Sequence, residues 1–426
     1  MRLAAAALLT TVVPTAVGFL LVRGGHIALR LGLGGVLGIA ILGLGAMLGG
    51  LAGSFEAGAA ISMIATLVWA RSQRRPARSV DGSPPVLPIL LVVVVGMFLL
   101  VISWSRPVSR FDGWAFWSLK AKAIASTGDF SSPIFTDAEY EYSHRDYPPL
   151  LPAWQALSYR ISGDLTVGHP TQFQLAWLWT CAGLAVVGLA GRRRSLAGFA
   201  LFAWLLAPQV VEEAVSGYAD VPMALFLIVG MVALLRSEEL GVAVGAILVA
   251  AAAVTKAEGL VFAVAAIVPF LVVARYRLRA MVAAAAIILA FGPWFAFTQS
   301  HGLTGDVTRP PLEAGHIDPE RDPVERVPTV LEGLGRYGIK PTDWGILGPV
   351  AILAIGLSRF RPIPLIAAAL LSVVAWVVVY LGTPFEVGWH LSTSADRVLI
   401  APLGLLALAA GGAELLTRED EAIPAP

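Results

Sequence analysis

The sequence predicts an all-α, polytopic transmembrane helix bundle, and three observations lead to this fold class. The 426 residues have a mean hydropathy of +0.77, with 57% apolar and only 14% charged residues, whereas soluble domains hold about 25% charged residues. Apolar runs of about 20 residues, long enough to cross the hydrocarbon core, recur along the chain. The runs do not alternate polar and apolar residues, which disfavours a transmembrane barrel. Water-soluble enzyme classes are thereby excluded, and the net charge of +1 excludes a nucleic-acid binder driven by bulk charge.

We expect about 11–13 membrane spans from the apolar runs, several of them short enough to be tilted or broken. The single cysteine, Cys181, lies inside one run, so no intrachain disulfide is possible and a packing role is expected. The expected spans are 3–22, 31–50, 55–70, 86–104, 172–190, 195–210, 221–236, 240–254, 259–274, 280–299, 345–358, 363–381 and 398–415.

The charged residues predict the orientation of these spans. Every second short loop is basic, which places those loops in the cytoplasm by the positive-inside rule. Most of the 29 Asp and Glu residues fall on the opposite side, where the two long segments 105–171 and 300–344 also lie. The basic residues concerned are Arg71, Arg74, Arg75, Arg78, Arg192, Arg193, Arg194, Arg236, Arg275, Arg277, Arg279, Arg359 and Arg361.

The chain divides into four parts on this basis. Residues 1–85 hold N-terminal spans and a basic cytoplasmic linker, and residues 86–299 form a core that includes the first long outer loop, 105–171. The second outer loop, 300–344, is rich in Pro, Gly and acidic residues and is predicted to be irregular or partly mobile. Residues 345–426 hold the last spans and a short cytoplasmic tail, which we expect to be disordered after Thr417.

The first outer loop begins with a candidate for chemistry. Asp112 follows the point where the fourth span should leave the membrane. A helical stripe of Trp114, Trp117, Ala121 and Ile124 follows, and we expect it to lie in the membrane interface. With Lys120 beside it, the stripe is interpreted as a cradle for a lipid head group and its phosphate. The alternative is an interfacial helix that only covers the bundle.

A second polar motif in this loop is SHRDYPP, in which Tyr147 and two prolines set a rigid turn. His144, Arg145 and Asp146 stand directly before that turn. Nothing else of a kinase accompanies the HRD triplet, so this match carries no weight. His144 has no second ligand at a spacing typical of a metal site.

Three further clusters map to the same outer side. They are Glu212, Glu213, Tyr218 and Asp220 in EEAVSGYADVP, Lys256 and Glu258 in TKAEG, and His390, Asp396 and Arg397 in EVGWHLSTSADRVLIAP. Each is open to a local explanation as an ion pair or a helix cap, and the candidate ion pairs are Lys256 with Glu258 and Asp396 with Arg397. Ionisable groups near lipid are costly and usually line a site or pair with one another, so five clusters on one side favour a shared site.

The motifs FDGWAFWSLKAKAI, YPPLLP, GYADVPMALF, TKAEGL and HLSTSADRVLIAPL, in this order over roughly 105–405, resemble polytopic glycosyltransferases of the GT-C superfamily. The closest likeness is to the branch with protein O-mannosyltransferases and lipid A aminoarabinose transferases. Asp112 is followed here by Gly, where the mannosyltransferase pattern has Glu. More expected spans precede the catalytic loop here than the one span that many relatives have.

The resemblance implies a bundle of GT-C type with a layer of outer loops and interfacial helices. It implies transfer of a sugar from a polyprenyl-phosphate donor to a lipid, glycan or protein acceptor, usually with inversion. The setting would be the bacterial inner membrane, with the active site on its extracytoplasmic face. Asp112 matches the acidic residue that serves as base.

The chemistry of this reaction agrees with the residue types. It needs a general base, for which Asp112 is the candidate, and positive charge on the departing phosphate, for which Lys120, Lys256 or Arg397 are candidates. Asp146 and Asp220 are expected to bind hydroxyls. The remaining candidate substrate-binding residues are Trp114, His144, Arg145, Tyr147, Tyr218, Glu258, His390 and Asp396. The absence of a Walker loop or GxGxxG motif fits a lipid-linked donor. A divalent metal is possible but not required.

Two other classes of function stay open from the sequence. A transporter or flippase for a lipid-linked sugar would bury charges near mid-membrane and often repeat its halves, but the charges here gather at one side and no repeat is detected. A structural or assembly protein would not need five ionisable clusters on one side. The enzyme is therefore the favoured hypothesis.

Overall fold

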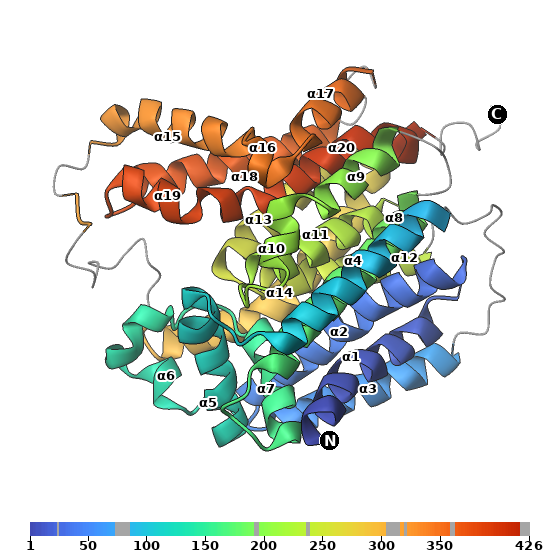
Figure 1. Cartoon of the computed structure of the whole chain (residues 1–426), viewed down its shortest axis with the longest axis vertical. Coiled ribbons are helices and arrows are strands. Elements are labelled where there is room, and N and C mark those ends of the chain that lie inside the picture. The colour runs from blue at the N-terminus through green and yellow to red at the C-terminus, as the bar shows by residue number, and fades with distance from the viewer. Residues whose placement is uncertain are drawn as a thin grey trace.

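The computed structural model describes residues 1–23, 25–72, 86–190, 196–235, 239–303, 316–318, 322–357 and 363–417. Within these ranges the chain is built of helices and contains no strand. Helices distant in sequence lie side by side in one bundle (Figure 1). The all-α bundle predicted from the sequence is therefore confirmed.

The N-terminal helices α1 (Arg2–Leu21), α2 (Ile27–Leu51) and α3 (Phe55–Ser72) pack against one another at one edge of the bundle (Figure 1). Glycines set the distance between α1 and α2. A Cβ on Gly38 would lie 1.8 Å from the carbonyl oxygen of Pro14, and one on Gly18 would lie 1.9 Å from that of Gly34. Such close backbone approach is typical of helix pairs in membranes, where packing rather than the hydrophobic effect drives association.

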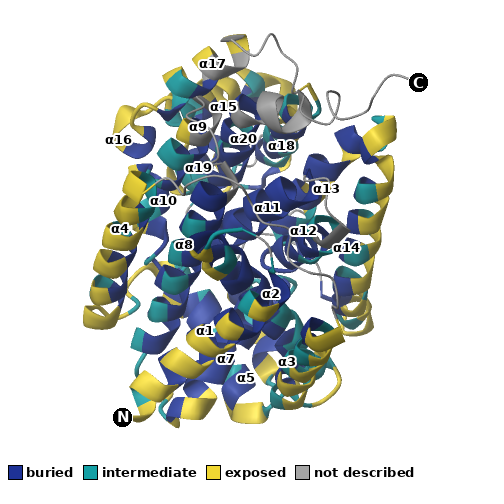
Figure 2. Cartoon of the chain, turned by 90° about the vertical axis from the view of Figure 1, so that its right-hand side faces the viewer, coloured by how far each residue is buried: buried dark blue, intermediate teal, exposed yellow. Residues whose placement is uncertain are grey.

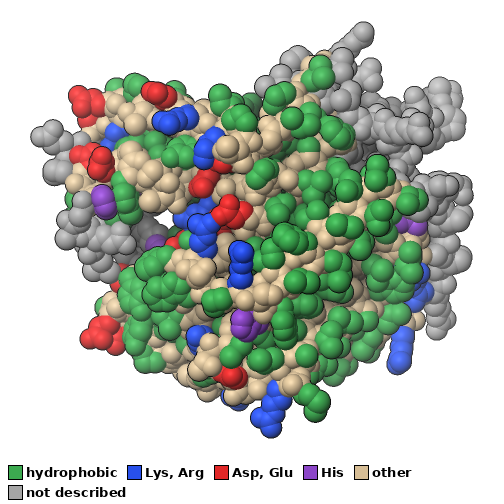
Figure 3. All heavy atoms as spheres, in the orientation of Figure 1, with side chains coloured by type: hydrophobic (Ala, Val, Ile, Leu, Met, Phe, Trp, Pro, Cys, Tyr) green, Lys and Arg blue, Asp and Glu red, His purple; other side chains and the backbone are tan. Residues whose placement is uncertain are grey.

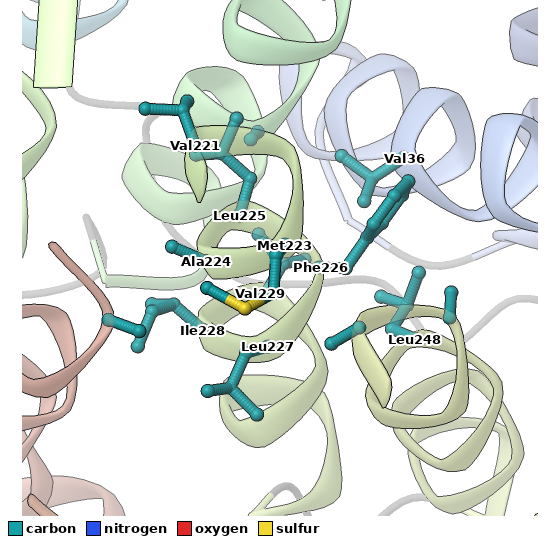
Figure 4. Close-up of a cluster of buried hydrophobic side chains, with 14 of the residues drawn as sticks. Val36, Val221, Met223, Ala224, Leu225, Phe226, Leu227, Ile228, Val229 and Leu248 are labelled. Carbon is teal, nitrogen blue, oxygen red and sulfur yellow. The ribbon is translucent and has the colours of Figure 1, made fainter. Parts of the chain in front are cut away.

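The centre of the bundle is α11 (Asp220–Leu234), in which every residue is buried. A helix that is apolar on all sides is stable only when other helices surround it. In Figure 4 its side chains point outward in several directions, with Val36 of α2 and Leu248 of α12 (Glu239–Ala253) among the neighbours. Because α11 begins at Asp220, a buried carboxylate lies at the N-terminal end of this helix.

Helices on several sides complete the middle of the bundle, with α12 on α11 and α4 on α8 as close pairs. Their bounds are α4 (Val86–Ser105), α8 (His169–Ala190), α9 (Leu196–Leu205), α10 (Pro208–Glu213), α13 (Ala257–Leu271) and α14 (Ala274–Ser300).

Residues 113–162, in the first of the two long segments, fold into short helices: η1 (Gly113–Ser118), a π-helix, then α5 (Leu119–Thr127), α6 (Pro133–Thr136), η2 (Ala138–Ser143) and α7 (Leu150–Ser162). The prediction of an aromatic stripe in the membrane interface is wrong. Trp117, Ala121 and Ile124 are buried in the protein core, and only Trp114, 52% exposed, faces outward. The apolar face of α5 packs on α7.

The second long segment, 300–344, also departs from expectation, because it contains α15 (Pro323–Gly338) instead of irregular chain throughout. The side chain of Asp322 accepts a hydrogen bond from the backbone N–H of Val324, and Pro323 occupies the first turn, an arrangement typical of helix starts. Arg326, Val330 and Leu334 form its buried face. Residues 304–315 and 319–321 lie outside the described part.

The last part of the described chain forms helices α16 to α20. The bounds are α16 (Pro341–Trp344), α17 (Leu347–Leu357), α18 (Ile363–Gly382), α19 (Val387–Val398) and α20 (Ile400–Thr417). Helices α18 and α20 pack against each other, and α15 packs on α18 and α19.

Five described helices, α1, α2, α4, α14 and α18, are long and apolar enough to cross a membrane, and α19 with α20 makes a sixth if this pair, bent by 41°, is one span. The exposed residues lie on the outward sides of peripheral helices (Figure 2). Each apolar stretch expected from the sequence overlaps a helix. The expected number of about 11–13 membrane crossings stays a prediction, and so does their orientation. Several basic loops, and the tail after Thr417, lie outside the described residues.

Candidate functional site

Charged residues from four distant segments meet at the N-terminal end of α11. Nη1 of Arg397 in α19 lies 2.6 Å from Oδ2 of Asp112, directly before η1, and 3.9 Å from Oδ2 of Asp220. The side chain of Arg397 is 15% exposed and that of Asp112 is 23% exposed. Nη2 of Arg397 donates to the carbonyl oxygen of Thr393 at 2.8 Å. The arginine is thus held from its own helix and joined to two other segments.

Asp220 continues these contacts to the segment between α12 and α13. Its Oδ1 accepts a hydrogen bond from Nζ of Lys256 at 2.9 Å, and the same Nζ lies 3.1 Å from Oε1 of Glu258. Burial alone would lower the pKa of Lys256, but the charges of Asp220 and Glu258 outweigh it and raise that pKa. The ammonium group therefore stays charged between two carboxylates. We call Asp112, Asp220, Lys256, Glu258 and Arg397 the charge network.

Two glycines bring Asp112 to this place. A Cβ on Gly113 would lie 2.7 Å from the carbonyl oxygen of Ser216 and 3.3 Å from the Cα of Gly217. Gly217 itself has a φ of +90°, a conformation that glycine adopts at little cost. The start of the π-helix therefore packs directly on the backbone of the loop before α11. This contact gives a physical reason for the glycine that follows Asp112.

Tyr218, from the same loop, covers the arginine. The guanidinium carbon of Arg397 lies 4.6 Å from the centroid of the Tyr218 ring, a distance typical of cation–π contacts. Burial, and then the negative charge of Asp112, raise the pKa of Tyr218. The phenol thus stays neutral and forms one wall of the charge network.

Two residues near the charge network, Glu213 and Gln209, were not among the predicted site residues, although Glu213 belonged to a predicted polar cluster. Glu213, the last residue of α10, is only 4% exposed, and its Oε2 has no hydrogen-bond partner within the described residues. Burial raises the pKa of Glu213 to about 7, and the neighbouring charge of Asp220 acts in the same direction. Gln209 of α10 donates from Nε2 to Oδ2 of Asp396 at 3.3 Å. No sequence signal distinguishes Glu213 from its exposed neighbour Glu212, which pairs at the surface with Arg110.

The residues predicted around the SHRDYPP motif form a separate group. The His144 ring stacks on Tyr147, with centroids 4.6 Å apart, and meets the edge of Phe116 in η1 at 4.7 Å. Lys120 is completely buried, and its Nζ donates to the carbonyl oxygen of His144 at 2.5 Å. This group packs against the π-helix that directly follows Asp112.

Three other predicted residues make contacts outside the charge network. Arg145 is buried and pairs with Glu141. The carbonyl oxygen of Asp146 accepts from Nε1 of Trp294 at 2.9 Å. The His390 ring packs edge-on against Tyr380, with centroids 4.9 Å apart.

The local ion pairs expected from the sequence have mixed outcomes. Lys256 does pair with Glu258, but its second partner is the distant Asp220. Arg397 pairs with Asp112 rather than with its neighbour Asp396, whose carboxylate accepts from Gln209 and from the backbone N–H of Arg397. The five sequence clusters thus converge only in part, with Asp112, Tyr218, Asp220, Lys256, Glu258 and Arg397 in one place.

The charge network suits an anionic reactant with hydroxyl groups. It holds three carboxylates and two cations, and the part of the chain that the structure describes contains no group of three metal-binding side chains. Figure 3 shows acidic and basic side chains gathered beside an opening between the upper and lower helices, while much of the remaining face is apolar. Carboxylates can accept protons and arginine can bind phosphate in a fork.

No family model matches the chain, and no curated protein and no solved structure is detectably similar to it. The resemblance to GT-C glycosyltransferases therefore rests on the ordered motifs alone.

Proposed function

We propose that the chain is a membrane glycosyltransferase of GT-C type that transfers a sugar from a polyprenyl-phosphate donor to an extracytoplasmic acceptor. The acceptor is a lipid, glycan or protein, and the setting is the bacterial inner membrane. One observation carries the proposal: the Asp112 carboxylate, the candidate base, lies 2.6 Å from the Arg397 guanidinium, the candidate phosphate ligand. Both functions that the reaction needs are thus available within one small site.

The reaction follows from these two groups. The acceptor hydroxyl oxygen attacks the anomeric carbon on the face opposite the phosphate, so the configuration inverts. Its proton passes to the Asp112 carboxylate as the new carbon–oxygen bond forms. The bond between the anomeric carbon and the phosphate oxygen breaks, and the electron pair leaves with polyprenyl phosphate. The charge that develops on this phosphate is stabilised by Arg397.

The buried part of the charge network supports the remaining requirements. Asp220, held by Lys256, presents a carboxylate that hydroxyl groups of the sugar can donate to. The side chain of Asp220 is only 3% exposed, so its position is fixed before substrate binds. A group that is already in place needs less reorganisation during the reaction.

A transporter or flippase for a lipid-linked sugar is the second candidate. It is favoured by the burial of Asp220 and Lys256 at the ends of apolar helices, because ionisable groups within a membrane protein also mark transport pathways. The two candidates differ in whether the donor is consumed.

The test supplies purified protein in nanodiscs with radiolabelled polyprenyl-phosphate sugars, one at a time, together with membrane extract as acceptor. We expect one donor to be consumed, and Asp112→Asn to lower the rate by about 10²–10⁴-fold, the usual contribution of a general base. Glu212→Gln, which removes a nearby exposed carboxylate, should keep full activity. Full activity of Asp112→Asn would overturn the assignment of the base. Protein-dependent translocation in vesicles without consumption would support the flippase.

A further inference from the structure

We propose that the phosphate of the lipid-linked donor takes the place of Asp112 on Arg397, so that donor binding itself releases the base. This inference rests on the proposed function and adds an order of events to it. The donor must bind before the acceptor hydroxyl can be deprotonated, because Asp112 is bound to Arg397 until an anion displaces it.

The geometry identifies Asp112 as the partner that leaves. Asp220 is also near Arg397, but at 3.9 Å, and Lys256 holds it through its other oxygen at 2.9 Å. The side chain of Asp220 is 3% exposed, whereas that of Asp112 is 23% exposed. An incoming anion therefore reaches the Asp112 side of Arg397, and the carboxylate that it replaces is the more accessible one.

The other candidate cations are committed elsewhere. Lys256 lies between Asp220 and Glu258, within 3.1 Å of an oxygen of each. Lys120 is completely buried, with its ammonium group on the carbonyl oxygen of His144. Arg397 is therefore the cation of the predicted set that a phosphate can bind by exchanging one partner.

The charges favour an exchange over a simple addition. With three carboxylates and two cations, the charge network carries one net negative charge, so a further anion beside an intact pair meets repulsion. When a phosphodiester replaces Asp112, Arg397 keeps one anionic partner and the carboxylate becomes free to accept a proton. As the glycosidic bond breaks, the phosphate gains a second negative charge, and its attraction to Arg397 grows during the reaction.

The experiment measures binding of decaprenyl phosphate to the full chain in nanodiscs of neutral lipid, with inorganic phosphate as a second probe. In wild type, part of the binding energy is lost in displacing Asp112, which lowers the apparent affinity. Asp112→Asn should therefore bind decaprenyl phosphate roughly three- to tenfold more tightly, and Arg397→Gln should lose most binding. Glu212→Gln is the matched control and should equal wild type. Asp112→Ala repeats the test if Asp112→Asn does not fold.

The outcomes separate this inference from the function on which it rests. Equal or weaker binding by both Asp112 variants would overturn the exchange and leave the glycosyltransferase intact. If no variant binds decaprenyl phosphate and no sugar is transferred, the proposed function fails and the exchange falls with it. Binding of inorganic phosphate with the same gain in the Asp112 variants would assign the exchange to free phosphate instead of a lipid head group.

Discussion

Asp112 and Arg397 are separated by 285 positions, yet Oδ2 of the aspartate accepts a hydrogen bond from Nη1 of the arginine at 2.6 Å. No local element links them. The contact exists because η1 packs on the loop before α11 and because α19 brings its arginine to the same end of that helix. The candidate site is therefore a product of the tertiary fold, and changes in packing should alter its chemistry.

The buried pair of Lys256 and Asp220 should be costly to break. Lys256→Met leaves the Asp220 carboxylate buried without its nearest cation, and we expect a loss of about 3–5 kcal/mol in the free energy of unfolding. The measurement is unfolding of the purified protein in mild detergent. Lys340→Met, which breaks an ion pair with Asp343 in which the lysine side chain is 48% exposed, should change stability by less than about 1 kcal/mol.

The double variant Lys256→Met, Asp220→Asn completes this prediction. Removing both charges should restore much of the lost stability, since the penalty comes from an unpaired buried charge. A double variant as unstable as Lys256→Met alone would contradict the electrostatic explanation.

Glu213 should make stability depend on pH. Its pKa is raised to about 7 by burial, so the folded state keeps a proton that the unfolded chain loses above its ordinary pKa near 4.5. Stability contributed by this group is therefore present at low pH and is lost as pH rises through 7. Glu213→Gln should be more stable than wild type at pH 8, by up to about 3 kcal/mol, with the difference vanishing towards pH 4. Melting curves of both proteins across this range provide the check, and a difference independent of pH would refute it.

Gly113→Ala should disturb the site more than the fold. The new Cβ would meet the carbonyl oxygen of Ser216 at 2.7 Å, so η1 must move away from the loop before α11 and carry Asp112 with it. We expect a fall in sugar transfer of about tenfold or more, with a loss of about 1–3 kcal/mol in stability. Gly335→Ala, where nothing lies within 4 Å, is the control. Wild-type transfer by Gly113→Ala would show that this contact does not position Asp112.

Gly38→Ala tests the close packing of α1 and α2. Its Cβ would overlap the carbonyl oxygen of Pro14 at 1.8 Å, and the two helices must separate, at a cost of about 3 kcal/mol or more. The same substitution at Gly292 in α14 meets nothing within 4 Å and should stabilise by about 0.5–1 kcal/mol through helix propensity. Comparing the melting temperatures of the two variants isolates the effect of contact, and equal temperatures would contradict it.

The positions of the helices were predictable because long apolar runs leave few alternatives to helix in a membrane. The faces of the helices were harder to predict. Trp117 and Ile124 have the period of an interfacial stripe, but periodicity does not distinguish lipid from the apolar side of a neighbouring helix. The start of α15 was signalled by Asp322, Pro323 and Glu325, and the surrounding Pro and Gly residues obscured it.

Only part of the predicted residue set lies at the candidate site, and most of the pairs that these residues form were not predicted. Lys256 and Glu258 are two positions apart, and their contact follows from local geometry. Asp396 and Arg397 are neighbours whose side chains leave the helix in different directions, so adjacency suggested the wrong partner. Glu213 was grouped with Glu212 in one polar cluster, and its burial was not predicted because a carboxylate in a polar stretch of sequence gives no sign of burial.

The position of Arg397 in the chain has a consequence for biosynthesis. A ribosome delivers Asp112, Asp220, Lys256 and Glu258 first, and the arginine that balances Asp112 emerges only after most of the bundle has been made. During this interval the nascent chain holds Lys256 as the only cation for three carboxylates of the charge network. The charge network is therefore complete only once α19 has docked, and a premature stop before this helix would leave Asp112 without the arginine that pairs with it.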